Sequence, residues 1–111
     1  MEEKSNDIPL TLKGNHALEL AREISKLPGG DFHIVFFPYS RAHGTSSAKL
    51  RTIEHCKWRP QLPQEAFDID PDNYFLFSDR HGDPKMCYRI LIRYMAFPTD
   101  GYVLHPVKWL E

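Results

Sequence analysis

The sequence lacks the features that mark secreted and membrane proteins. It has only two cysteines, Cys56 and Cys87, among 111 residues. Its first residues are acidic and polar, without the basic start and apolar stretch of a secretory signal. We therefore expect reduced thiols and not a disulfide. The longest apolar runs, such as residues 34–37, are far too short to cross a bilayer. These absences predict a cytoplasmic protein with no membrane partner.

Motifs for catalysis, metals and cofactors are missing too. Ser40, Ser46 and Ser47 stand near His43, but there is no G-x-S-x-G elbow and no acid placed to orient a base. Residues 44–47 lack the glycine-lysine pair of a P-loop. The histidines and cysteines show neither the C-x-x-C nor the H-x-x-x-H spacing of zinc sites. We predict no catalytic residue, no metal and no cofactor, and an enzyme is the least favoured class.

One acidic stretch partly imitates a calcium loop. Asp68, Asp70 and Asp72 alternate, and Asp79 takes the twelfth place counted from Asp68. Asn73 stands where an EF-hand loop has glycine, and strand-forming residues follow where its second helix should begin. A polar turn leading into a strand is the preferred interpretation. The sequence alone leaves calcium binding at residues 68–79 open.

Length and composition indicate one globular domain. Apolar residues make up 41% and charged residues 26%, and 111 residues leave no room for a second core. Residues 1–14 are expected to form a flexible lead-in, although Ile8, Leu10 and Leu12 alternate and could add a short strand. The domain is then 15–111.

The N-terminal part predicts an amphipathic helix. Asn15 is a suitable N-cap, and Pro28-Gly29-Gly30 is a stop signal. Between them the apolar residues recur at steps of three and four, which puts them on one helical face. They are Ala17, Leu20, Ala21, Ile24 and Leu27.

The rest of the chain predicts strands: 32–39, 49–59, 74–78, 86–95 and 102–109. Gly82 suits the turn of a hairpin between the third and fourth. The fourth is expected to be the longest and to put Tyr88 and Ile92 on its core side. Pro106 suggests that the last is an edge strand. The expected fold is α+β: one N-terminal helix on a strongly bent, mainly antiparallel sheet of about five strands, which a small SH3-like or OB-like barrel would satisfy.

Charge is unevenly distributed although the formal net charge is only −1. If residues 49–59 are extended, side chains of alternate residues emerge on one side as a basic row. Arg89 and Arg93 would share a strand face and could extend it, and guanidinium groups suit phosphates and carboxylates. A basic row beside aromatic rings is how small β domains hold single-stranded nucleic acid. The candidate binding residues are Arg41, Lys49, Arg51, His55, Lys57, Arg59, Arg89 and Arg93.

The simpler interpretation of the basic row is a solvated strand face. Residues 61–84 contain six acids against one base, Arg80, so this segment could neutralise the lysines and arginines. The sequence favours this interpretation over nucleic-acid binding, because charge runs are usually only solvated surface.

Two stretches carry a resemblance, HIVFFPYSRAHGTSSAKLRTIEHCKWRPQLP and NYFLFSDRHGDPKMCYRILIRYMAFP. Together they resemble small uncharacterised proteins encoded by prophage-like and other mobile elements of Bacteroides-type bacteria. The resemblance covers roughly residues 31–98. It implies a bacterial or phage setting and an accessory or structural role, and it implies no catalytic residue.

Two functional hypotheses follow. The first is a non-enzymatic accessory module that binds a partner through the basic row, with nucleic acid the leading candidate and an acidic protein the other. The second is a small structural or assembly protein, such as a phage head or tail component or a homo-oligomer subunit. Edge strands and exposed aromatic residues near 102–109 could carry such contacts.

Overall fold

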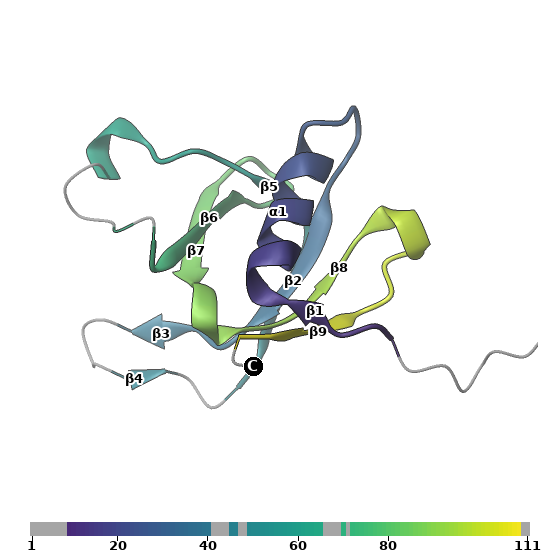
Figure 1. Cartoon of the computed structure of the whole chain (residues 1–111). Helices are drawn as coiled ribbons and strands as arrows, with labels where there is room; N and C mark the ends of the chain where they lie inside the picture. Colours follow the sequence, from purple (N-terminus) through teal and green to yellow (C-terminus); the bar gives the residue numbers. More distant parts are fainter. Residues whose placement is uncertain (1–8, 41–44, 47–48, 66–69, 71, 110–111) are drawn as a thin grey trace, which may run out of the picture.

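The computed structural model describes residues 9–40, 45–46, 49–65, 70 and 72–109. One α-helix, α1 (Gly14–Ser25), lies across a sheet (Figure 1). The strands are β1 (Leu12–Lys13), β2 (Phe32–Phe36), β3 (Tyr39–Ser40), β4 (Thr45–Ser46), β5 (Arg51–Trp58), β6 (Tyr74–Ser78), β7 (Pro84–Tyr88), β8 (Ile92–Ala96) and β9 (His105–Lys108). Short 3₁₀ turns η1 (Pro63–Glu65), η2 (Arg89–Leu91) and η3 (Pro98–Asp100) connect them.

The main sheet has seven strands in the order β1-β9-β8-β2-β5-β6-β7. Every neighbouring pair is antiparallel except β1 and β9. Strands β3 and β4 form a separate two-stranded ribbon. The predicted α+β class and mainly antiparallel sheet are therefore confirmed. The predictions of about five strands and of a small barrel are wrong, because β1 and β7 end the sheet at opposite sides and it stays open.

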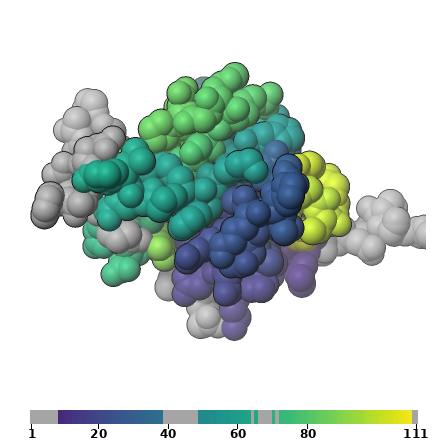
Figure 2. Space-filling model, turned by 90° about the horizontal axis from the view of Figure 1, so that it is seen from above, coloured from purple at the N-terminus to yellow at the C-terminus, as the bar shows by residue number. Residues whose placement is uncertain are grey.

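Helix α1 covers the centre of the sheet with the predicted apolar face. Ala17, Ala21 and Ile24 are buried against strand residues that include Phe32 and Phe75. The helix starts at Gly14, with Lys13 in the N-cap position, so the prediction of Asn15 as N-cap is wrong. It ends at Ser25, which leaves Leu27 60% exposed beyond the last turn. Seen from above, the helix lies beside the chain that leaves β5 (Figure 2).

The predicted long strand over residues 86–95 is broken in two. Turn η2 separates β7 at one end of the sheet from β8, which lies between β9 and β2. The backbone of η2 is hydrogen-bonded to the segment that follows β2: the Phe37 N–H donates to the Leu91 carbonyl at 3.0 Å. The expected period-two face is lost, since Ile92 is buried while Ile90 is 64% exposed.

Strand β9 is paired on both sides, so the prediction of an edge strand is wrong. Pro106 lies opposite Tyr94 of β8, and β1 on the other side is only two residues long. Because β1 has only two residues, it forms few hydrogen bonds with β9, and β9 tolerates the missing N–H of Pro106. Leu12 in β1 is buried in the core, so the end of the expected lead-in belongs to the sheet.

The predicted hairpin is confirmed, with Gly82 at a φ of 84° between β6 and β7. Cys56 and Cys87 are free thiols and buried. Burial raises the pKa of Cys56 to about 12, so this thiol is protonated and unreactive at neutral pH.

Candidate functional site

The predicted extended conformation of the basic segment is confirmed over β5, but a bulge interrupts it. Phe32 of β2 pairs with Cys56, whereas Ile34 pairs with Ile53, so two residues of β5 oppose one of β2. His55 in the bulge has a φ of 58°. Such an insertion reverses which residues face the core. Ile53 packs against the core before the bulge, and Cys56 is buried in it after the bulge.

The bulge divides the expected basic row. Lys49 and Arg51 are exposed on the first half of the segment, and Lys57 is exposed on the second, where its ammonium donates to the Gly30 carbonyl. The His55 Nδ1 atom lies 2.9 Å from a carboxylate oxygen of Asp31. These side chains do not form one continuous row. Of the other candidates, Arg41 lies outside the described residues, as do His43 and Ser47.

Arg59 is a structural cation and not part of an exposed face. Its guanidinium forms a bidentate pair with Glu65 of η1, at 2.8 and 3.0 Å, and also donates to the carbonyls of Phe77 and Lys85. The hydrogen bond from Arg59 holds the pKa of Glu65 below its ordinary value. At Arg59 the acidic connection neutralises the basic segment, as the simpler interpretation expected.

Arg89 and Arg93 do not share a strand. Arg89 is the first residue of η2, is half-buried and donates from Nε to the Tyr74 carbonyl at 3.2 Å. Arg93 lies on β8 and is exposed, with its guanidinium 5.6 Å from the centre of the Phe37 ring. The two arginines therefore flank the crossover between β7 and β8.

A small hollow opens where β5 parts from β6. These strands pair only at Lys57–Ser78 and Trp58–Phe77, and the first half of β5 is free of β6. The hollow has a volume of about 210 Å³. Its charged lining residues are Arg51 and Lys85, beside apolar and aromatic ones. Tyr74 and Tyr88 in its wall stack at 4.5 Å and share a hydrogen bond of 2.9 Å between their hydroxyl groups.

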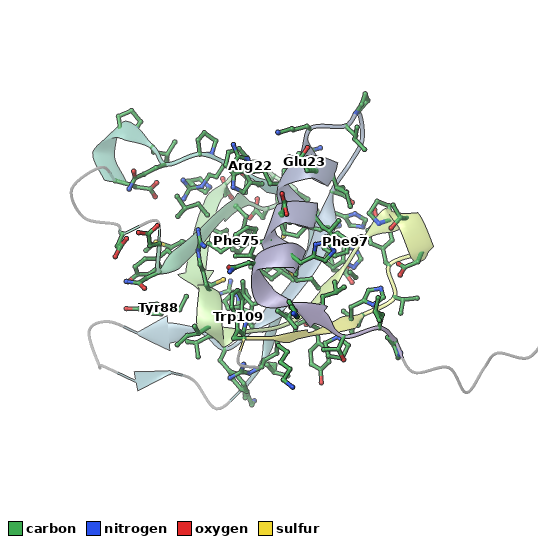
Figure 3. The ribbon with its side chains drawn as sticks, viewed as in Figure 1. Arg22, Glu23, Phe75, Tyr88, Phe97 and Trp109 are labelled. Carbon is green, nitrogen blue, oxygen red and sulfur yellow. The ribbon has the colours of Figure 1, made fainter. Side chains whose placement is uncertain are left out.

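Further hollows continue from this one around Trp109. Tyr88 also lines a hollow that contains Arg89, Ile90 and Trp109. Ile90 and Trp109 also line a third hollow, and Trp109 and Lys108 line a fourth. Figure 3 shows Tyr88 and Trp109 on the side of the molecule where α1 begins. We call this surface the basic track. Its lysines and arginines and its partly exposed tyrosine and tryptophan are Lys13, Arg51, Lys85, Arg89, Arg93, Lys108, Tyr88 and Trp109.

Cations outnumber acids along the basic track. The acidic residues that line its hollows are Asp72 and Glu19. Lys85 also lies 4.0 Å from Asp79, too long for a strong pair. The track includes Arg51, Arg89 and Arg93, which the sequence had indicated. Sequence reasoning assigned the aromatic residues near 102–109, Trp109 among them, to assembly contacts. It missed Lys13, Lys85, Tyr88 and Lys108, because they come from separate elements and no local spacing connects them.

Trp109 is held in place by close packing. Its indole N–H donates to the Ile92 carbonyl at 3.0 Å. A Cβ atom on Gly14 would lie 2.2 Å from the Trp109 ring, so only glycine fits at the start of α1. Trp109 stays half-buried, and its ring lines three of the hollows. A fixed, partly open indole is a suitable platform for stacking.

The described residues give no support to a metal site. Among them, no group of three or more histidine, cysteine, aspartate or glutamate side chains is placed to hold an ion. Asp70 accepts hydrogen bonds from the Asp72 backbone N–H and the Asn73 side chain within one turn, and Asp79 accepts from the backbone of a different turn. Asp68, the first residue of the calcium-loop pattern, lies outside the described residues.

Comparisons of the chain with protein-family models, curated proteins and solved structures gave no match. In the part of the chain that the structure describes, no helix has the length and apolar character needed to span a membrane.

Proposed function

We propose that this protein is a non-enzymatic accessory module that binds single-stranded nucleic acid along the basic track. The observation that carries the proposal is the series of hollows that share Tyr88, Ile90 and Trp109 while cations line each one. Phosphates would contact the cations, and bases would stack on Trp109 and the Tyr88 ring. A near-neutral chain can bind in this way because local charge, not net charge, makes phosphate contacts.

Several features favour a single strand over a duplex. The hollows are separate and lined by aromatic residues, and a base that stacks on one of these rings has to be unstacked from its neighbours in the strand. Among the described residues α1 is the one α-helix, and its exposed face carries Glu19 and Glu23, whose charge disfavours entry into a major groove. A setting in a phage or mobile element, as the sequence resemblance implies, is consistent with such an accessory role.

The test is fluorescence anisotropy with labelled 12-nucleotide single strands of DNA and RNA, and with the matching duplex, at low salt. Binding of the single strand should weaken as salt rises, with log Kd changing by about 3 per decade of salt if four phosphates are contacted. The double variant Arg51→Glu/Arg93→Glu should weaken binding about tenfold or more at low salt.

Lys26→Glu is the matched control, because Lys26 is exposed beyond α1 and lies away from the basic track. It should bind like the parent protein. The proposal fails if no oligonucleotide binds at low salt, or if the control weakens binding as much as the double variant. Sedimentation of the same samples tests the other hypothesis, since a subunit of an assembly should associate without any oligonucleotide.

A further inference from the structure

A second polar cluster lies away from the basic track, where β2, the β5 bulge and the connection after η3 meet. Its members are Asp31 just before β2, His33 on β2, His55 in the bulge and Tyr102 in the connection. None of them lines the hollows of the basic track. The cluster joins chain segments that are far apart in the sequence, so any change in it acts on tertiary structure.

Asp31 bridges two of these segments through its carboxylate. One oxygen lies 2.9 Å from Nδ1 of His55, and the other accepts a hydrogen bond of 2.5 Å from the Tyr102 hydroxyl. Because a carboxylate only accepts, His55 donates from Nδ1. Asp31 thereby fixes the orientation of both rings.

The His33 ring packs against both of these rings, which also contact each other at 5.5 Å. Its imidazole stacks on the Tyr102 ring at 4.2 Å and meets the His55 ring edge-on at 4.7 Å. The Nε2 atom of His33 is buried and has no hydrogen-bond partner. A neutral imidazole tolerates this position if Nε2 carries the lone pair, whereas an imidazolium must donate from both nitrogens.

Two residues of the cluster have a left-handed backbone. His55 has a φ of 58° and Tyr102 a φ of 65°; histidine adopts this region more readily than most residues, and a bulky ring such as that of Tyr102 does so rarely. Such conformations persist only where surrounding contacts hold them. Here those contacts are the hydrogen bonds to Asp31 and the stack with His33. The connection over residues 97–104 is therefore poised to relax if the cluster opens.

We propose that Asp31, His33, His55 and Tyr102 form an acid-sensitive latch, which holds the 97–104 connection on β2 at neutral pH and releases it when His33 is protonated. A charged His33 would place a buried N–H without an acceptor beside the His55 ring. Rotation of the ring into water satisfies that donor, and it removes the surface on which Tyr102 stacks.

The charged groups around His33 mostly oppose its protonation. Burial lowers the pKa of His33, and His55 on β5 and Arg80 in the β6–β7 turn act in the same direction. Glu54 on β5 and Asp31 act against them but leave the pKa below its ordinary value. Protonation therefore favours the open form. An imidazolium would be attracted to the Tyr102 ring, but that attraction leaves the buried N–H without an acceptor.

Beyond the cluster, the connection is also held by the pair of His105 and Asp100, which protonation of His105 does not break. Nε2 of His105 lies 2.5 Å from the Asp100 carboxylate, and its Nδ1 lies 2.8 Å from the Leu10 carbonyl. An imidazolium donates to both oxygens, so this end stays fixed while the cluster opens. Opening is therefore local, and the sheet remains folded.

Amide hydrogen exchange with mass spectrometry tests the latch. The Tyr102 N–H donates to the Phe97 carbonyl at 2.9 Å, and this bond breaks when Tyr102 leaves the left-handed region. After correction for the intrinsic pH dependence of exchange, protection of peptides over 97–104 should fall about tenfold between pH 7.5 and pH 5. Peptides of β6 and β7 should keep their protection.

The variant His33→Phe keeps a ring on Tyr102 but cannot be charged, so its protection should not change over this pH range. His16→Gln, at an exposed position of α1, is the matched control and should behave like the parent protein. Should His33→Phe fail to fold, NMR titration of the parent replaces it: the Tyr102 ring signals should shift together with those of His33. The latch is refuted by equal protection at both pH values, or by a pH response that persists in His33→Phe.

Discussion

Arg59 is a buried cation whose hydrogen bonds connect separate elements of the fold. Only 9% of its side chain is exposed, and its guanidinium joins η1 to the carbonyls of β6 and β7. A buried guanidinium is tolerated because each donor has an acceptor and Glu65 balances the charge. Removing the partner would leave that charge uncompensated, which costs more free energy than the intact pair contributes.

Glu65→Gln should therefore lower the free energy of unfolding by about 2 kcal/mol at pH 7. The pKa of Glu65 is lowered in the folded protein, so its contribution is present above the ordinary value of 4.5 and is lost as pH falls through the lower folded value. Urea denaturation at pH 7 and pH 3 should show the difference between variant and parent closing in acid. Glu23→Gln, in an exposed pair with Lys26, should change stability by less than about 0.5 kcal/mol. Equal losses in the two variants would contradict this role for Arg59.

At the scale of elements, the bulge in β5 and turn η2 decide which side chains meet. The bulge leaves Ile53 and Cys56 both in contact with the core although they are three residues apart. Turn η2 sends β8 across the molecule from β7, and it leaves Ile90 exposed on the basic track. Turn η2 thus contributes to the surface that we propose binds nucleic acid, whereas the bulge brings His55 to Asp31 and His33.

The contact between α1 and Trp109 gives a prediction at this scale. Gly14→Ala would place a methyl group only 2.2 Å from a carbon of the Trp109 ring, so the indole must move and lose its hydrogen bond to the Ile92 carbonyl. We expect faster exchange of the Trp109 indole proton in NMR spectra and weaker oligonucleotide binding. Glu23→Ala, at an exposed position near the other end of α1, should leave the indole signal unchanged. An unaltered indole signal in Gly14→Ala would show that this glycine does not position Trp109.

These elements also show what the sequence can predict. The apolar stripe of α1, the Gly82 turn and the extended β5 follow from local spacing, and local spacing was enough to place them. The bulge at His55 was not predictable, because no glycine marks it and contacts with Asp31 and His33 hold it. The break at Arg89–Leu91 was missed for a similar reason, since this segment is rich in strand-forming residues and contacts from distant segments turn it. Tertiary contacts of this kind also assemble the basic track.

At the scale of the whole molecule, two histidines give stability opposite dependences on pH. Although burial acts to lower the pKa of His105, its hydrogen bonds to Asp100 and the Leu10 carbonyl raise it overall. Its contribution is thus present below the ordinary value of 6.5 and is lost as pH rises through the raised value. Burial lowers the pKa of His33, so its contribution is present above 6.5 and is lost as pH falls through the lowered value.

The free energy of unfolding should therefore pass through a maximum near pH 6.5, where both contributions are present together. Urea denaturation from pH 5 to pH 9 measures the curve. His33→Phe should flatten its acid side, and His105→Gln should flatten its alkaline side, because each variant removes one titrating group. A curve that rises or falls steadily through this range in the parent protein would contradict the opposed roles. So would a variant that flattens the wrong side, since the sign of each slope follows from the partners that surround each ring.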